Sequence, residues 1–80
     1  MSEIQINKLH SIIASILNID VDLVSLHTSP ENTSEWDSFA HIAILTEVEE
    51  EFGLKFDFEE MFEIISVASL IEMLNNKLGY

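Results

Sequence analysis

The chain has 80 residues, of which 48% are hydrophobic, and contains two glycines and one proline; this composition excludes a disordered segment and predicts one small globular domain over residues 1–80. The absence of cysteine excludes disulfides and thiolate metal sites. Fifteen acidic residues against three lysines give a net charge of −12, which disfavours nucleic acid and anionic membranes and favours partners with basic surfaces.

The first part of the chain predicts a helix followed by a long loop. Apolar residues from Ile6 to Leu17 recur at helical spacing and predict a helix over residues 3–17, with Asn18 at its end. The segment SPENTSE is rich in turn-forming residues, so residues 18–37 are expected to form a long connection with a short helical turn near 22–25. The loop's apolar residues are expected to pin it to the core: Ile19, Val21, Leu23, Val24 and Leu26.

A second helix is predicted over residues 38–52. Asp37 is suited to cap it and Gly53 to end it, and one of its faces carries an apolar stripe: Ile44, Leu45, Val48 and Phe52. Leu54 and Phe56 then alternate with polar residues, which we interpret as an extended linker.

The remaining residues predict a short third helix over 57–63 and a fourth helix that Ser66 caps and Gly79 ends. The fourth helix has an apolar set on one face: Val67, Leu70, Ile71, Leu74 and Leu78. The fold class is therefore all-α, a four-helix bundle with a short third helix and a long loop between helices one and two.

Ser38 is the main candidate functional residue. With Asp37 as the cap, the Ser38 hydroxyl is free to point to solvent, where the positive end of the helix favours a phosphate group. Beside it, a second apolar stripe is offset from the core stripe and suggests a docking surface: Phe39, Ile42, Ala43 and Thr46.

The segment WDSFAHIAILTEVEEEFGLKF resembles the acyl carrier proteins and the related peptidyl carrier domains. The family's Asp-Ser-Leu motif, which opens a helix ending in Glu-Glu-Phe, reads here Asp37-Ser38-Phe39 and then Glu50-Glu51-Phe52. The likeness continues through a short acidic third helix to Ser66 and Val67, and covers nearly the whole chain. It implies a carrier-protein bundle without catalytic activity of its own.

The resemblance implies that Ser38 carries 4′-phosphopantetheine, which a separate phosphopantetheinyl transferase moves from coenzyme A with the help of magnesium. The thiol of this arm then holds an acyl or aminoacyl group as a thioester. Asp37 would serve both as the helix cap and in recognition by the transferase. Further partners would be acyl-transfer, condensing or ligase enzymes that carry basic docking patches.

The resemblance also assigns a docking surface on helix two and the turn into helix three: Phe39, Ile42, Thr46, Glu49, Glu50, Phe56 and Met61. Ala43 stands where many fatty-acid carriers have a docking glutamate, so fatty-acid synthesis is in doubt and a polyketide or other specialised pathway remains open. In family members, an opening between helices two and three takes short acyl chains, and Phe58, Met61 and Phe62 are candidates to line it here.

Other interpretations stay open. An aminoacyl or peptidyl carrier shares the chemistry, and an unmodified acidic interaction module shares the surface. A Ser38–His41 nucleophilic pair is disfavoured because no oxyanion hole is indicated, and the acidic residues do not match a calcium loop, so no metal site is expected. Trp36 is expected to pack the loop onto the bundle. With no basic N-terminal leader and no apolar run of membrane-spanning length, a cytoplasmic monomer is expected.

Overall fold

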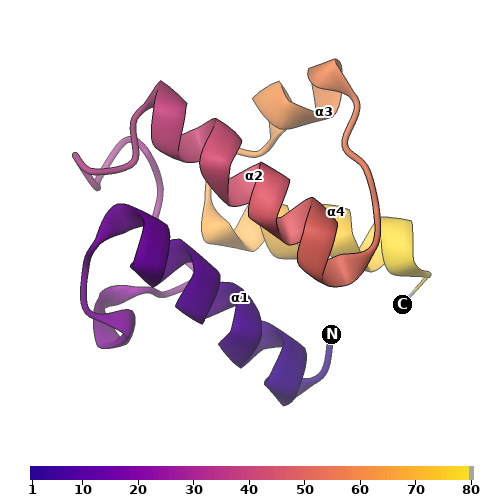
Figure 1. Cartoon of the computed structure of the whole chain (residues 1–80), viewed down its shortest axis with the longest axis horizontal. Helices are drawn as coiled ribbons and strands as arrows, with labels where there is room; N and C mark the ends of the chain where they lie inside the picture. The colour runs from indigo at the N-terminus through magenta and orange to yellow at the C-terminus, as the bar shows by residue number, and fades with distance from the viewer. Residues whose placement is uncertain (80) are drawn as a thin grey trace.

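The computed structural model describes residues 1–79, which form four α-helices and one short 3-10 turn, without strands (Figure 1). The helices are α1 (Glu3–Leu17), α2 (Ser38–Phe52), α3 (Phe58–Glu63) and α4 (Val67–Leu78). In Figure 1, α1 lies below α2, α4 lies behind them, and the short α3 lies beyond α2 at the top of the view. The predicted all-α bundle is confirmed. Within residues 1–79, no helix combines the length and the apolar character that crossing a bilayer requires.

The helix ends follow the local signals in the sequence. Asn18 adopts the left-handed conformation at the end of α1 with φ of 56°, and Gly53 does the same after α2 with φ of 67°. The Ser66 hydroxyl accepts a hydrogen bond from the backbone N–H of Ser69 at 3.1 Å and caps α4. Helix α3 begins at Phe58, one residue later than predicted, because Asp57 is its N-cap and lies outside it.

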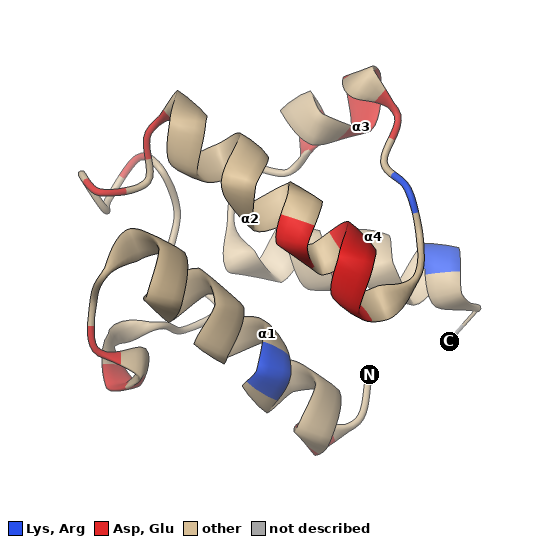
Figure 2. Cartoon of the chain, viewed as in Figure 1, with Lys and Arg blue, Asp and Glu red and all other residues tan. Residues whose placement is uncertain are grey.

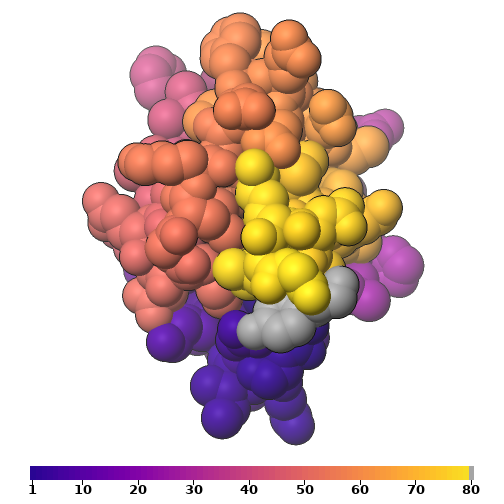
Figure 3. Space-filling view, turned by 90° about the vertical axis from the view of Figure 1, so that its right-hand side faces the viewer, coloured from indigo at the N-terminus to yellow at the C-terminus, as the bar shows by residue number. Residues whose placement is uncertain are grey.

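One hydrophobic cluster joins α1, α2 and α4. Its fully buried members come from all three helices: Leu9, Ile13, Ile44, Leu45, Val48, Val67, Leu70 and Leu74. Figure 3 shows the C-terminal end of α4 between α3 at one end of the molecule and the N-terminal residues at the other. Helix α2, at whose first position Ser38 lies, is therefore packed against α1 and α4 through its middle residues.

The loop of residues 18–37 differs from the prediction in how it is held. Its helical turn is Val21–Leu23 rather than 22–25, and Val21, Leu23 and Leu26 are exposed instead of pinning the loop to the core. Val24 is buried as expected, and Ile19 packs against the core in part.

Hydrogen bonds also anchor this loop, in addition to its buried residues Val24 and Trp36. The buried Thr28 hydroxyl accepts from the backbone N–H of Ser25 at 2.9 Å. The Thr28 carbonyl accepts from Val67 N–H at 2.9 Å, and the Leu26 carbonyl accepts from Ala68 N–H at 3.1 Å. Because the first N–H groups of a helix have no partners within it, the loop and the start of α4 satisfy each other.

An ion pair ties α3 to α4. Glu60 Oε1 accepts from Lys77 Nζ at 2.8 Å and from the backbone N–H of Asp57 at 2.7 Å. The hydrogen bond from Lys77 is the main reason that the pKa of Glu60 lies below its ordinary value of 4.5, and the bond from Asp57 adds to the effect. Lys77 also lies 5.8 Å from the centre of the Phe56 ring, so the same ammonium group contacts the linker before α3.

This pair predicts acid-sensitive attachment of α3. Because the folded-state pKa of Glu60 is depressed, its stabilising contribution is present above the unfolded-state value and is lost as pH falls through the folded-state pKa. In thermal melts at decreasing acidic pH, Glu60→Gln should therefore lose less stability than the wild type does. Glu59→Gln, a neighbouring exposed position, is the control and should follow the wild type. Parallel curves for the wild type and Glu60→Gln would contradict the assignment.

Candidate functional site

Ser38 is the first residue of α2, and its side chain is exposed. Within residues 1–79, the Ser38 hydroxyl makes no hydrogen bond to another side chain or to the backbone. It therefore neither caps the helix nor takes part in a buried network. An incoming enzyme can reach this oxygen without unfolding any element.

Asp37 is the N-cap of α2, so the Ser38 hydroxyl is not needed to cap the helix. Asp37 Oδ1 accepts from the backbone N–H of Ala40 at 2.9 Å, and the Asp37 carbonyl accepts from His41 N–H at 2.9 Å. The predicted cap is thus confirmed. Since the backbone N–H groups at the start of a helix carry partial positive charge, a phosphodiester on Ser38 would meet a favourable local field.

A mainly apolar cavity of about 620 Å³ borders Ser38. Apolar residues of α2, α3 and the segment after α3 line it: Ile42, Phe58, Met61, Phe62, Ile64 and Ile65. Trp36, Asp37, Ser38 and His41 contribute to the wall at the start of α2. The expected opening between helices two and three, with Phe58, Met61 and Phe62 along it, is therefore present. Its volume is within the range of pockets that bind small organic groups.

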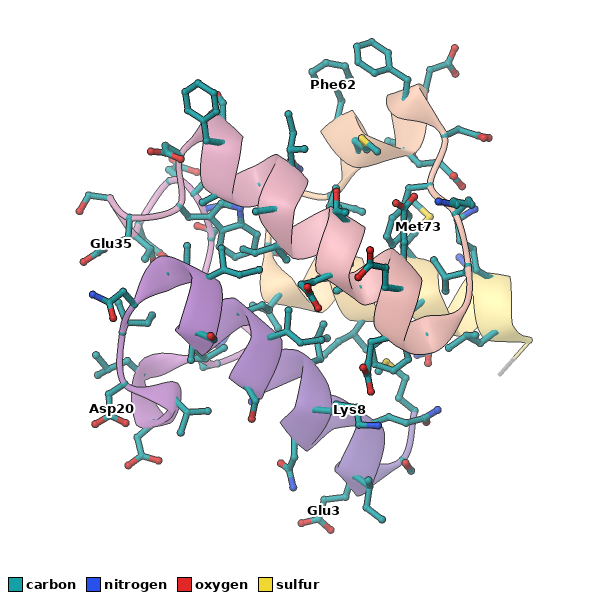
Figure 4. All side chains as sticks on the ribbon, viewed as in Figure 1. Glu3, Lys8, Asp20, Glu35, Phe62 and Met73 are labelled. Carbon is teal, nitrogen blue, oxygen red and sulfur yellow. The ribbon has the colours of Figure 1, made fainter. Side chains whose placement is uncertain are left out.

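The surface around the cavity mouth is apolar. Phe39 is 86% exposed, and Phe58 and Phe62 are 75% and 70% exposed. Phe62 projects from the outer side of α3 in Figure 4. Phe58 and Phe62 contact each other edge to face, with ring centres 4.9 Å apart. Phe58 and Phe62 line the cavity, whereas Phe39 follows Ser38 in the first turn of α2 and does not line it. Exposed aromatic groups of this size are typical of a surface that meets a partner.

Charge is unevenly distributed along α2. Residues 38–46 contain no Asp, Glu, Lys or Arg, and all acidic residues of the helix lie in its second half (Figure 2). Lys8 of α1 reaches Glu51 at 2.7 Å and neutralises part of that charge (Figure 4). Glu47 and Glu50 are exposed at the same end. The predicted docking face is therefore apolar near Ser38 and acidic away from it.

The predicted docking residues do not all lie on this face. Phe39, Ile42, Thr46 and Glu50 are exposed, and Met61 is half-buried. Phe56 was expected on the surface but is only 6% exposed, because it packs into the core between the helices. The half-buried Glu49 is engaged within the chain, since its Oε2 accepts from the Phe56 N–H at 2.8 Å.

Trp36 and His41 have roles that the sequence indicated only in part. Trp36 is 2% exposed and packs the loop onto the bundle, as expected. His41, which the sequence disfavoured as a catalytic partner of Ser38, has a structural role and is bonded on both sides: Trp36 Nε1 donates to its Nδ1 at 2.9 Å, and its Nε2 lies 2.8 Å from the Met61 carbonyl oxygen. No local pattern could have revealed the second bond, because its acceptor is a backbone atom 20 residues further on.

The site lacks the parts of a hydrolytic centre. With both ring nitrogens engaged, His41 does not act as a base for Ser38, and the nucleophilic pair disfavoured from the sequence is not formed. Among residues 1–79, no group of three or more potential metal ligands is found. What the site offers is a free hydroxyl, a positive helix end and an apolar cavity. These features fit a phosphopantetheine arm, whose phosphate and apolar cargo need opposite environments.

The sequence and the fold can be compared with those of known proteins. Residues 7–74 match the sequence profile of the family described as "Phosphopantetheine attachment site". The fold matches the solution NMR structure of a holo acyl carrier protein from Geobacter metallireducens with a TM-score of 0.81 and 23% identity, over 92% of this chain and 85% of that chain. A search of curated protein sequences gives no match.

The structural match supports the helical architecture, and the profile match covers Ser38, α2 and the cavity. The predicted cofactor is confirmed as covalently attached phosphopantetheine, and the working thiol need not come from the cysteine-free chain itself. The chain therefore belongs to the phosphopantetheine attachment family and is a carrier domain, not an enzyme.

Proposed function

We propose that the protein is an acyl carrier protein in which Ser38 bears the phosphopantetheine arm and presents thioester-bound acyl groups to biosynthetic enzymes. The observation that carries this proposal is the free, exposed Ser38 hydroxyl at the start of α2, directly beside an apolar cavity. The attached arm supplies a thiol that holds the cargo as a thioester. Asp37 keeps the helix start formed, so the serine stays outside the capping network.

The apolar lining of the cavity favours an acyl cargo over an aminoacyl cargo. An aminoacyl thioester carries an ammonium group, and burying a charge without a partner costs several kcal/mol or more. The cavity presents Ile42, Met61 and Ile64 to such a group, with Glu31 as the one acidic side chain that lines it besides Asp37. An aliphatic chain, by contrast, gains from leaving water in this environment.

Docking to partner enzymes would use the two parts of the α2 face differently. A phosphopantetheinyl transferase and later acyl-transfer, condensing or ligase enzymes would meet apolar Phe39 and Ile42 next to the attachment point. A basic patch on the partner would meet Glu47 and Glu50 at the far end of the helix. Charge would then speed and orient the encounter, while the apolar part would hold the site near Ser38 in place.

The proposal is tested by loading the purified protein. Incubation with coenzyme A, magnesium and a broad-specificity phosphopantetheinyl transferase should add one arm, detected by intact mass and located by fragmentation to the peptide that contains residue 38. No mass gain with several transferases would favour the unmodified interaction module. Loading the modified protein with acyl and with aminoacyl donors then separates the two carrier classes. Faster acquisition of aminoacyl groups would overturn the acyl assignment.

A further inference from the structure

From the Trp36–His41–Met61 contacts, we infer that His41 is a positioning residue: its Nε2 holds α3 at a fixed distance from the start of α2, while its Nδ1 is bonded to Trp36, and the bond to α3 sets the size of the cavity beside Ser38. The assignment of the cavity to acyl cargo rests on the proposed function above. The positioning role itself rests on hydrogen bonds and can be measured without any cargo.

The hydrogen bonds define the tautomer of the His41 ring. An indole N–H is a donor only, so Trp36 Nε1 must donate to His41 Nδ1, which is 2.9 Å away. In a neutral imidazole the other nitrogen then carries the proton. His41 Nε2–H therefore donates to the Met61 carbonyl oxygen at 2.8 Å. One side chain thus connects the loop before α2, α2 itself and α3.

The carbonyl that His41 contacts is one that α3 cannot satisfy itself. Helix α3 has six residues, and the last four carbonyls of an α-helix have no intrahelical partner. Met61 lies among these four. A helix this short is not stable alone and must be held from outside. His41 provides that support from the α2 side, and Lys77 provides it from the α4 side through Glu60.

Side-chain burial gives α3 little other support. No residue of α3 is fully buried, and its aromatic residues Phe58 and Phe62 face solvent. Trp36, His41 and Met61 all line the cavity, so the two hydrogen bonds lie along its wall. If the bond to Met61 is lost, α3 is free to move away from α2, and the wall that limits the cargo moves with it.

Two substitutions separate the two bonds of His41. In His41→Gln the amide nitrogen takes the place of Nε2 and can still donate to the Met61 carbonyl. In His41→Asn the amide oxygen can still accept from Trp36, but the shorter side chain does not reach Met61. A role in packing alone would also make His41→Asn the looser of the two, because Asn is the smaller side chain. A third variant, His41→Leu, keeps an apolar bulk similar to that of Gln but has no donor for Met61, so it should exchange like His41→Asn if His41 positions α3 and like His41→Gln if it only packs. A positioning role predicts that only the loss of the Met61 bond loosens α3.

The first measurement is amide hydrogen exchange on the complete, unmodified protein. In His41→Asn the amides of residues 61–63, which make the backbone bonds of α3, should exchange about fivefold faster than in the wild type, as expected for one lost hydrogen bond, while His41→Gln should stay within about twofold. Amides of α1 serve as the internal reference and should not change. Equal α3 exchange in wild type and His41→Asn, or equal acceleration in both variants, would overturn the inference. If α1 also exchanges faster in His41→Asn, the effect is general unfolding and the inference is likewise overturned.

The second measurement concerns the cargo. Proteins carrying saturated acyl groups of increasing length on the arm are treated with hydroxylamine, and the rate of thioester cleavage is recorded. In the wild type and in His41→Gln, the thioester should lose its protection from hydroxylamine at the same acyl chain length. In His41→Asn this loss should occur at a different chain length. Identical length profiles in all three proteins would remove the cavity-setting role. Failure to load any protein would count against the proposed function, while the exchange experiment would still decide the role of His41.

Discussion

A Ser38→Ala variant should gain no mass when incubated with coenzyme A, magnesium and a phosphopantetheinyl transferase, whereas the wild type gains one arm. The reason is that the arm needs a hydroxyl oxygen for its phosphodiester bond, and Ser38 presents an unbonded one at the start of α2. The loss should be complete rather than partial. Intact-protein mass spectrometry measures it directly.

The matched control is Ser34→Ala. Ser34 is an exposed serine four residues earlier, but it lies in the loop, away from a helix start, and its hydroxyl donates to Glu35. This variant should be modified as fast as the wild type. Because residue 38 is exposed and alanine is a good helix former, Ser38→Ala should change the free energy of unfolding by no more than about 0.5 kcal/mol. Normal mass gain in Ser38→Ala would assign the arm to another residue.

Trp36→Ala should lower the free energy of unfolding by about 3–5 kcal/mol, the usual cost of removing a large buried aromatic side chain. Trp36 is 2% exposed and joins the loop to the core. Its loss also leaves His41 Nδ1 without its donor. A domain of this size has a total stability of roughly 4–12 kcal/mol, so the variant would be close to unfolding.

The measurement is urea unfolding followed by far-ultraviolet circular dichroism, since Trp36 is the chain's one tryptophan and its fluorescence disappears with it. Phe39→Ala is the control. Phe39 is also an aromatic residue near the start of α2, but it is 86% exposed, and its removal should cost no more than about 0.5 kcal/mol. A cost below 1 kcal/mol for Trp36→Ala would show that the loop does not depend on this contact.

The helices were predictable because their signals are local. Asn18, Gly53 and Ser66 each end or begin a helix by a property of one residue and its next neighbours, and the structure places them as predicted. The free Ser38 hydroxyl followed in the same way, because Asp37 is the better cap. The attachment role of Ser38 itself stays a prediction.

The loop and the linker were not predictable to the same degree because their contacts are distant in sequence. The apolar residues Val21 and Leu23 suggested anchors, yet they are exposed, and the loop is held by Val24, Trp36, Thr28 and backbone bonds to α4. Phe56 lies in an extended segment in which apolar and polar residues alternate. This alternation shows that the two sides of the segment differ in polarity, but it does not show which side packs against the core. The cavity and the His41 bonds likewise depend on where α3 lies, which no residue near His41 specifies.

The bonds between residues 26–28 and the first turn of α4 have a consequence for synthesis on the ribosome. The segment leading to Ser38 obtains these anchors from Val67 and Ala68, and the N-terminal amine of Met1 finds its acceptor in Asn75. In a nascent chain that has emerged only as far as α3, the segment before Ser38 lacks these partners in α4. On the proposal that Ser38 bears the arm, we therefore expect a transferase to modify the chain only after the last helix has joined the bundle.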